Sequence, residues 1–334
     1  MRFRQKVKRI ILYEFWPPYL FYLPFLPVWI IYSIRSVDLI YFTRINPKMK
    51  FGGFMQYSKY EIIKSIPEKY LVKSYFYSEK PKDNCFYKDT LTFPFIYKPD
   101  IGERGKEVNL FRTEGDFDQF INNVDCSFIL QEYCDYPIEL GVLYHRFPNG
   151  ESQITSVVKK TFLHVTGNGS STLEELAKEE IRAYNKLDFL AKKFSAKWNQ
   201  AIPAGEIIVL EEIGNHCRGT TFIDACELIS PELTAVFDEI AKNIPDFYYG
   251  RFDLKVKSIE DLLQGKNIKI FELNGVNSEA AHIYDPKHNI FYAYKKISKE
   301  LKTVFEISCE LKALGVEKPN TTIEFLKALR KQLS

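Results

Sequence analysis

The sequence predicts an α+β fold, in which helices are mixed with strands that form hairpins. Short apolar runs that end in proline or glycine are typical of strands, and two of them flank a Pro148-Asn149-Gly150 turn, which predicts a hairpin. Strands and helices do not alternate as they do in parallel βαβ units. With 334 residues, of which 46% are hydrophobic, the chain is long enough for one large domain or two medium ones with real cores.

The predicted elements follow one another from residue 57 onward. We expect a short helix interrupted at Pro67 within 57–75, strands at 93–99, 108–112 and 127–133, a helix at 114–122, hairpin strands at 139–147 and 149–160, helices at 172–195 and 231–244, strands at 247–256 and 269–275, and a last helix at 322–333. Two helices open with capping boxes, Thr172-x-x-Glu175 and Thr321-x-x-Glu324.

The N-terminal region differs from the rest in charge and hydropathy. Residues 1–60 contain ten Lys and Arg against two acidic residues, and residues 15–34 contain no charge. About 20 apolar residues can span a bilayer, but four prolines weigh against one straight helix. The aromatic, proline-rich stretch has no small-residue cleavage site, which argues against a signal peptide.

Three interpretations of residues 15–34 are open. The segment inserts shallowly into the membrane interface, with its aromatic rings at headgroup depth and the basic residues on anionic lipid. Alternatively, it forms a broken, re-entrant hairpin, or it covers a groove on its own domain or on a partner subunit. We favour the first, which places the protein on the cytoplasmic side of the membrane as a peripheral or monotopic protein.

The net charge and the cysteines exclude several classes of function. A net charge of +3, concentrated at the N-terminus, argues against a nucleic-acid partner. The six cysteines form no CxxC pair and have no histidine at ligand spacing. This pattern argues against a zinc site or a disulfide framework and favours reduced thiols in a cytosolic environment.

Two predicted strands near the C-terminus carry the residues with the clearest chemistry. Arg251 and Asp253 point to one face of the first strand, because side chains alternate along a strand, and by the same rule Glu272 and Asn274 share a face of the next. If the strands pair, three side-chain oxygens converge beside a guanidinium, and such hard oxygens suit Mg²⁺. The alternative is a charged face that meets solvent, but charges on otherwise apolar strands are costly without a function.

Two other segments fit a nucleotide site less specifically. Lys98 ends an apolar strand, and the loop that follows contains Gly102 and Gly105, whose backbone can approach phosphate oxygens. An ordinary strand-turn-strand with a surface lysine is the alternative. The stretch 131–134 enters a connector and can offer backbone groups to a purine edge, while Glu139 can accept hydrogen bonds from ribose hydroxyls.

Taken in chain order, these motifs over about residues 57–285 resemble the ATP-grasp superfamily, in particular D-alanine–D-alanine ligase-like and cyanophycin synthetase-like carboxylate–amine ligases. The pairs Arg251-x-Asp253 and Glu272-x-Asn274 are similar to the metal-binding motifs of the family, Lys98-Pro99 to its phosphate-binding lysine, and VTGNGSSTLEEL at 165–176 to a loop of the cyanophycin synthetase-like ligases.

The resemblance implies a role for each residue. It implies catalytic roles for Arg251, Lys98 and Lys160, two Mg²⁺ ions on Asp253, Glu272 and Asn274, and ATP binding by Lys98, Gly102, Gly105, Gln131, Glu132, Tyr133, Cys134, Glu139 and Lys160. Lys159 is the alternative to Lys160. Weaker candidates for substrate contacts are His216, Arg218, Asn46-Pro47 and Gly52-Gly53; a solvated loop histidine is the alternative for His216. We assign no role to His282 and His288, which we expect in a surface loop.

The resemblance also implies an architecture and a reaction. Two α+β subdomains, 46–130 and 131–310, clasp ATP, between a membrane-associating segment at 1–45 and a C-terminal helix at 311–334. The reaction activates a carboxylate as an acyl phosphate and joins it to an amine, with small-molecule or lipid-linked substrates. The alternatives are a kinase of a non-carboxylate substrate and a non-catalytic nucleotide-binding scaffold.

Two departures keep the substrate open. ATP-grasp ligases usually carry a preceding α/β domain that helps to bind the carboxylate, and here fewer than 60 residues precede the grasp region. In addition, the stretch 275–279 replaces the tighter glycine-rich end that closes the dipeptide ligase site.

Overall fold

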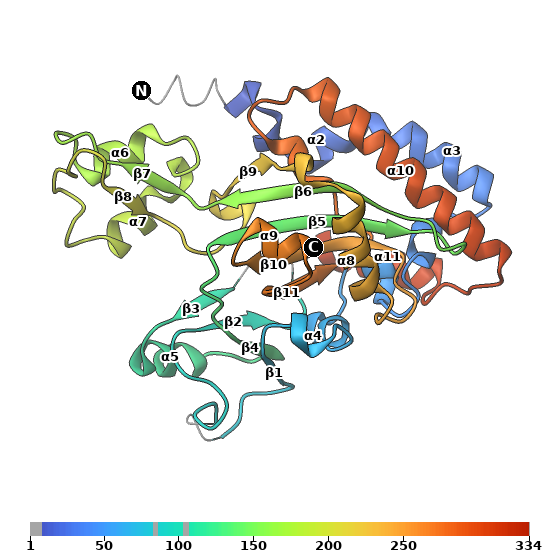
Figure 1. Ribbon diagram of the computed structural model, residues 1–334, viewed down its shortest axis with the longest axis horizontal. Coiled ribbons are helices and arrows are strands. Elements are labelled where there is room, and N and C mark those ends of the chain that lie inside the picture. The colour runs from blue at the N-terminus through green and yellow to red at the C-terminus, as the bar shows by residue number, and fades with distance from the viewer. Residues whose placement is uncertain (1–8, 83–85, 103–106, 334) are drawn as a thin grey trace.

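The computed structural model describes residues 9–82, 86–102 and 107–333. Gly105, Cys85 and most of the basic residues in 2–9 lie outside these ranges. Two antiparallel sheets form the centre of the molecule (Figure 1), in agreement with the predicted α+β class. The smaller sheet has four strands in the order β1-β4-β2-β3: β1 Ser74–Tyr77, β2 Phe95–Pro99, β3 Asn109–Phe111 and β4 Phe128–Glu132.

The larger sheet has five strands in the order β11-β10-β5-β6-β9. Their bounds are β5 Ile138–Arg146, β6 Ser152–Thr161, β9 Thr221–Asp224, β10 Tyr249–Val256 and β11 Ile268–Asn274. β5 and β6 form the predicted hairpin, and Gly150 adopts the left-handed conformation, φ +97°, in its turn. A separate pair, β7 His164–Thr166 and β8 Ile207–Val209, belongs to a small lobe that also contains two of the helices (Figure 1).

The bounds of the helices after the N-terminal segment are α4 Lys59–Ile63, α5 Glu114–Ile121, α6 Leu173–Glu179, α7 Leu187–Lys193, α8 Pro231–Ala241, α9 Ile259–Leu263, α10 Ile290–Ala313 and α11 Thr322–Leu333. α8 and α10 pack on opposite faces of the larger sheet, whereas α5 packs on the smaller sheet and α6 and α7 belong to the small lobe. The expected helix at 172–195 is two helices, because the backbone at Glu180 is extended. Its capping box is present, with the Thr172 and Glu175 side chains each bonded to the other residue's backbone N–H.

The main core lies on the face of the larger sheet that is turned away from Asp253. Val142, Phe252 and Leu254 are fully buried there against α8, which contributes Leu233 and Phe237. This apolar face holds β5 and β10 rigidly side by side, so the opposite face of the same strands can carry charged residues in fixed positions.

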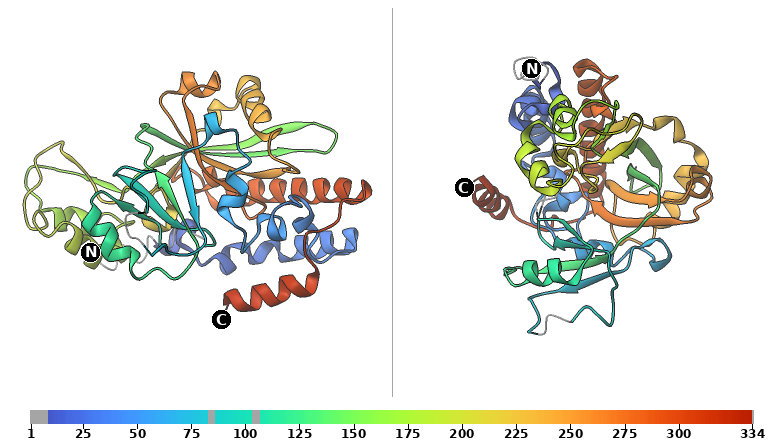
Figure 2. Two further views of the ribbon diagram at one scale, coloured as in Figure 1. Left: turned by 90° about the horizontal axis from the view of Figure 1, so that it is seen from below. Right: turned by 90° about the vertical axis from the view of Figure 1, so that its left-hand side faces the viewer.

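Prolines divide the N-terminal segment into short helices. These are η1 Tyr13–Phe15, α2 Pro18–Tyr22, η2 Leu23–Phe25 and α3 Leu26–Ser36. α3 runs beside α10 in both views of Figure 2, and Tyr32 stacks on Phe305 of α10 with ring centroids 4.3 Å apart. Phe21 and Phe25 are buried against Tyr294. Among the described residues, no helix is both long enough and apolar enough to cross a bilayer.

The N-terminal helices therefore have an inner and an outer face. The inner face covers α10, as the third interpretation of this segment expected. The outer face is apolar and exposed, with a spacing of three to four residues, and consists of Leu23, Leu26, Pro27, Ile30, Ile31, Ile34 and Val37. Ile34 is 71% exposed and Val37 is 85% exposed, so this face has no partner within the described chain.

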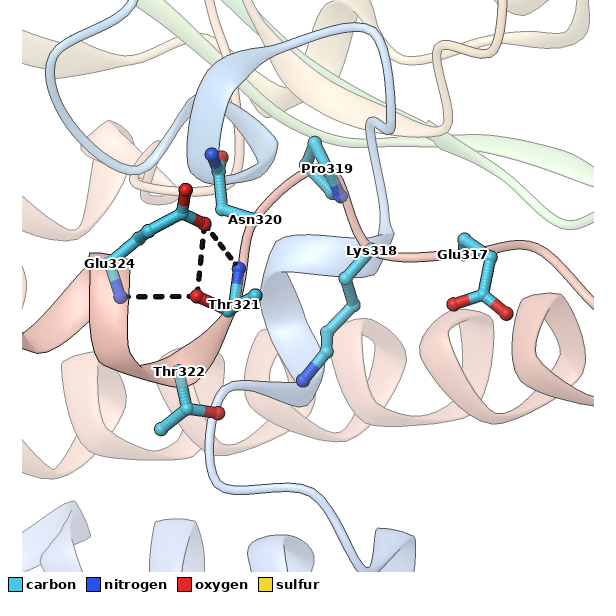
Figure 3. Close-up of a pocket in the computed structure, with 7 residues that line it drawn as sticks. All are labelled: Glu317, Lys318, Pro319, Asn320, Thr321, Thr322 and Glu324. Atoms are coloured by element: carbon cyan, nitrogen blue, oxygen red, sulfur yellow. Dashed lines mark hydrogen bonds between the residues drawn. The ribbon is translucent and has the colours of Figure 1, made fainter.

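The connection between α10 and α11 borders a surface pocket lined by residues 317–322 and Glu324 (Figure 3). Its polar groups largely serve to cap α11: the Thr321 N–H donates to Glu324 Oε2 at 2.7 Å, and the Glu324 N–H donates to the Thr321 hydroxyl at 3.2 Å. None of the predicted site residues lines this pocket.

Candidate active site

The two strands with the predicted metal ligands pair as expected. β10 and β11 are antiparallel neighbours, and Asp253 lies opposite Glu272 while Arg251 lies opposite Asn274. Asp253 is buried, with 1% of its side chain exposed, whereas Glu272 and Asn274 are partly exposed. The structure thus brings the predicted ligands together on one sheet face.

Asp253 is the centre of a network of charges. Arg251 donates from Nε and Nη2 to the two carboxylate oxygens at 3.1 and 3.0 Å, and Lys160 Nζ lies 3.2 Å from Oδ1. Burial alone would raise the pKa of Asp253, but the charges of Arg251 and Lys160 hold it below its usual range. Asp253 is therefore ionised at neutral pH despite its burial.

Lys160, rather than its neighbour Lys159, points into this network. Lys160 is buried, whereas Lys159 is exposed. Burial would lower the pKa of Lys160, but Asp253 and Glu139, whose Oε1 lies 3.1 Å from Nζ, raise it above its ordinary value. A cation in this position can face an anionic ligand without losing its charge.

The oxygen ligands fit a divalent cation by their chemistry. The Asn274 amide donates to Asp253 Oδ2 at 3.1 Å, and its carbonyl oxygen accepts from the Tyr57 hydroxyl at 3.0 Å. Glu272 adds a second carboxylate. Mg²⁺ takes such hard oxygens and keeps part of its water shell, so two carboxylates and an amide suffice. No three His, Cys, Asp or Glu side chains within the described ranges form a metal cluster of their own.

Gly141 of β5 makes room for this network. A Cβ at this position would lie 3.1 Å from Asp253 Oδ1 and 3.3 Å from the Arg251 Cδ. A side chain there would push against both groups. Sequence reasoning did not identify Gly141, because the restriction comes from the neighbouring strand.

Lys98 lies where the two sheets meet. Its Nζ donates to the Phe271 carbonyl of β11 at 2.8 Å and to Gln131 Oε1 of β4 at 3.1 Å. Burial lowers the pKa of Lys98 to about 8, and the charge of Glu272 opposes only part of that shift. Gln131 is held in turn by Ser74, whose hydroxyl accepts from Nε2 at 2.7 Å, so its side chain positions the lysine.

The loop after Lys98 is anchored at its start. Lys59 Nζ donates to the Gly102 carbonyl at 2.6 Å and to the Pro99 carbonyl at 3.1 Å. Gly105, the other glycine predicted to approach phosphate, lies outside the described residues. The phosphate contact of this loop stays a prediction.

The connector predicted to bind adenine joins β4 to β5. The Glu132 N–H donates to the Lys73 carbonyl at 2.9 Å, and the Cys134 carbonyl accepts from Lys255 Nζ at 2.9 Å. Lys255 Nζ also lies 5.0 Å from the centre of the Tyr133 ring. These contacts fix the connector beside the charge network, and its adenine contacts stay a prediction.

Glu139 does not face an open cleft. Its carboxylate pairs with Lys160, and the backbone of Gly214 packs directly against it. A Cβ at position 214 would lie only 2.0 Å from Glu139 Oε1. The ribose contact predicted for Glu139 therefore requires the loop around Gly214 to move.

His216 and Arg218 lie in this loop region, on η7 His216–Arg218. His216 Nε2 lies 3.3 Å from Glu14 Oε2, and Arg218 Nη1 lies 3.7 Å from Glu211 Oε1. Burial would raise the pKa of Glu14, but His216 and Arg182, 2.6 Å away, bring it below its ordinary value. His216 therefore connects η7 to the N-terminal segment and is not simply solvated.

The weaker candidates near residue 50 support the turn that follows β11. Asn46 is buried, and its Nδ2 donates to the carbonyls of Gly52 and Tyr249 at 3.1 and 2.8 Å. The Gly52 carbonyl accepts from the Val276 N–H at 3.1 Å, and a Cβ on Gly53 would lie 2.6 Å from the Gly275 Cα. These residues position the 275–279 turn beside Asn274.

The expectation of a surface loop is wrong for His282, whereas His288 lies in the partly exposed loop between η9 and α10. η9 Ala281–Tyr284 packs on β6 and β9. His282 is fully buried, with Nδ1 2.7 Å from the Ser156 hydroxyl, and burial lowers its pKa to about 4. His288 Nε2 lies 2.7 Å from Asp224 Oδ2. His282 is buried because η9 folds back over the sheet.

Comparison with known proteins supports the resemblance seen in the motifs. No family model matches the chain. The chain is 27% identical over 228 residues to the glutathione biosynthesis bifunctional protein GshAB of Clostridium perfringens (strain 13 / Type A). The match covers 62% of this chain and 28% of that protein, so the chain spans less than a third of this relative. This similarity confirms the resemblance to ATP-grasp ligases.

Among solved structures, the chain is similar to the D-alanine–D-alanine ligase of Bacillus anthracis, at 15% identity and a TM-score of 0.45, over 83% of this chain and 72% of that one. It is also similar to a bifunctional glutathione synthetase from Pasteurella multocida, at 13% identity and a TM-score of 0.40, over 74% of this chain and 36% of that one.

Proposed function

We propose that this protein is an ATP-dependent ligase that activates a carboxylate as an acyl phosphate and joins it to an amine. The observation that carries the proposal is the network around Asp253, where Arg251 and Lys160 contact a carboxylate placed beside Glu272 and Asn274. This set can hold a polyphosphate together with a divalent cation. The similarity to the clostridial protein supports the same class of reaction.

In the first step, which forms the acyl phosphate, each residue of the site has a separate role. Asp253, Glu272 and Asn274 would hold Mg²⁺, which supplies neutralisation of phosphate charge when bound. Lys98 and Lys160 offer ammonium groups to the phosphates. A carboxylate oxygen of the substrate attacks the γ-phosphorus, the bond to the β-phosphate oxygen breaks, and ADP leaves. Arg251 stabilises the transferring phosphoryl group, and such a preorganised donor is worth about 3 kcal/mol.

In the second step the amine nitrogen attacks the acyl carbon. The new C–N bond forms, the C–O bond to phosphate breaks, and inorganic phosphate leaves. In this proposal the sheet-containing parts 46–130 and 131–310 act as two subdomains that clasp ATP. The backbone of 131–134 binds adenine, and Glu139 binds ribose after the loop at Gly214 has moved.

Nucleotide product analysis tests this proposal. The full chain with Mg-ATP is incubated with panels of carboxylic acids and amines, beside Lys98→Ala, Asp253→Asn and the control Lys159→Ala, which removes an exposed lysine next to the site. We expect ADP only with a matching acid, retained activity in Lys159→Ala, and loss in the other two variants. AMP as the product would refute the acyl-phosphate route.

The same experiment separates the two alternatives. A stable phosphorylated product that condenses with no amine identifies a kinase. Binding of Mg-ATP without turnover on any panel identifies a nucleotide-binding scaffold. Both outcomes refute the ligase proposal.

We also propose that the outer face of the N-terminal helices docks on an anionic membrane from the cytoplasmic side. An exposed apolar stripe of this length, with the exposed Arg35 on the same helix, suits the interface between headgroups and acyl chains, where the apolar side chains insert and the cation meets anionic lipid. A lipid-linked substrate would then reach the site from the bilayer surface.

Vesicle sedimentation tests the docking. The full chain is mixed with phosphatidylcholine vesicles, either pure or containing about 30% phosphatidylglycerol, which gives the vesicles a negative surface potential. We expect pelleting with the anionic vesicles, and its loss in Leu26→Ser/Ile30→Ser but not in Phe291→Ser, a control that removes an even more exposed apolar residue from α10. Equal pelleting of both variants would refute this orientation.

A further inference from the structure

A second acidic group, Glu279, lies five residues after Asn274 of the proposed metal site. It follows Asn274 in the turn that Gly52 and Gly53 support, and its side chain is half-buried. Its oxygens accept hydrogen bonds from the hydroxyls of Tyr22, on α2, and Tyr284, on η9, the latter at 3.0 Å. No pattern near Glu279 connects it with Tyr22, which lies 257 positions away along the chain.

The charge of Glu279 has no partner cation within the described part of the chain. Both of its contacts are neutral hydroxyl groups, and the nearby Arg251 is bonded to Asp253. The negative charge of Glu279 nevertheless acts on Arg251 in the proposed site. Burial would lower the pKa of Arg251, but the charge of Asp253, and then the charges of Glu272 and Glu279, raise it. A half-buried carboxylate is stabilised when a cation binds to it.

The surroundings of Glu279 suit an organic cation. The Tyr284 ring packs against His216, with centroids 5.1 Å apart, and against Tyr13 at 6.1 Å. Burial, and then the charge of Glu279, raise the pKa of the Tyr284 hydroxyl, so it stays a neutral donor. An ammonium group can bind the carboxylate beside this aromatic cluster.

We propose that Glu279, positioned by Tyr22 and Tyr284, binds the ammonium group of the nucleophile and accepts its first proton. This inference rests on the proposed ligase function and names the substrate class on its acceptor side: a primary ammonium. Tyr22 and Tyr284 are positioning residues, and Glu279 is the group that touches the substrate.

The ammonium has three N–H protons. One passes to Glu279 and from there to solvent, which leaves a free amine whose lone pair attacks the acyl carbon. As the C–O bond to phosphate breaks, a second proton leaves the nitrogen with the departing phosphate, and the third stays on the amide.

Binding of a probe tests the subsite without knowledge of the natural substrate. Ligand-observed NMR of n-propylammonium is recorded with the full chain and Mg-ATP, with n-propanol as the uncharged probe. We expect propylammonium to bind in preference to propanol, and Glu279→Gln to weaken its binding at least tenfold. Glu317→Gln, which removes an exposed carboxylate in the pocket of Figure 3, is the control and retains binding. Equal binding by wild type and Glu279→Gln, or equal binding of both probes, would overturn the proposal.

Trapping with hydroxylamine separates this inference from the ligase proposal. Hydroxylamine is uncharged at neutral pH and captures acyl phosphates directly as hydroxamates. We expect Glu279→Gln to form hydroxamate like the wild type while its amine-dependent condensation falls at least tenfold. Tyr22→Phe should raise the KM for the amine with little change in hydroxamate formation. If the wild type formed no hydroxamate, the ligase proposal would be refuted. If Glu279→Gln lost hydroxamate formation and amine condensation equally, only the acceptor role of Glu279 would be refuted.

Discussion

Replacing Lys98 with Met should change how the stability of the ligand-free protein depends on pH. The pKa of Lys98 is about 8 in the folded protein, against 10.5 for an ordinary lysine, because the side chain is buried. Since the folded pKa is the lower one, the unfolded chain binds an extra proton between these values, and the free energy of unfolding rises with pH across that window. At 1.36 kcal/mol per unit, the full rise is about 3 kcal/mol.

Urea unfolding of wild type and Lys98→Met measures this effect as a difference, so that contributions from other titrating groups cancel. Between pH 7 and 9.5, about 2 kcal/mol of the rise should appear in the wild type and be missing in the variant. Saturating Mg-ATP should shrink the wild-type rise, because phosphate charge favours the protonated lysine. If the free energies of unfolding of the two proteins changed with pH in parallel, the lowered pKa assigned to Lys98 would be refuted.

Three further substitutions test other parts of the structure. Asp253→Asn should lower ADP formation by about 10²–10³-fold while circular dichroism stays unchanged, because it removes the charge that Arg251 and Lys160 share; near-normal turnover would contradict the proposed metal site. Gly214→Ala should cost about 1–3 kcal/mol in urea unfolding, since its Cβ would meet Glu139, whereas Gly115→Ala, with open space around it, should not destabilise. Thr172→Ala should cost about 1 kcal/mol, seen as faster amide exchange at the start of α6; unchanged exchange there would contradict the capping box.

The charged strands could be predicted from the sequence because the information is local. Alternation along 251–253 and 272–274 assigns each side chain to a face, and neighbouring strands joined by a short connection usually pair. Only the register then needed the structure, which places Asp253 opposite Glu272. The hairpin at Gly150 and the capping box at Thr172 were predictable for the same reason.

Contacts between distant segments could not be predicted in this way. The bond from Lys98 to the Phe271 carbonyl joins residues 173 positions apart, and the contact between Tyr22 and Glu279 spans 257 positions. Neither pair shows any signal in its own neighbourhood. The burial of His282 has the same origin, since it depends on how η9 packs against Ser156 of β6.

The packing of the N-terminal helices against α10 has a practical consequence for anyone who shortens the chain. A version that starts at residue 46 would uncover Tyr294 and Phe305 of α10 and remove Tyr22 and Glu14 from their contacts. Poor solubility or lost activity of such a fragment would then report damage to the folded body as well as loss of an attachment. Point substitutions on the outer face alone separate the two effects.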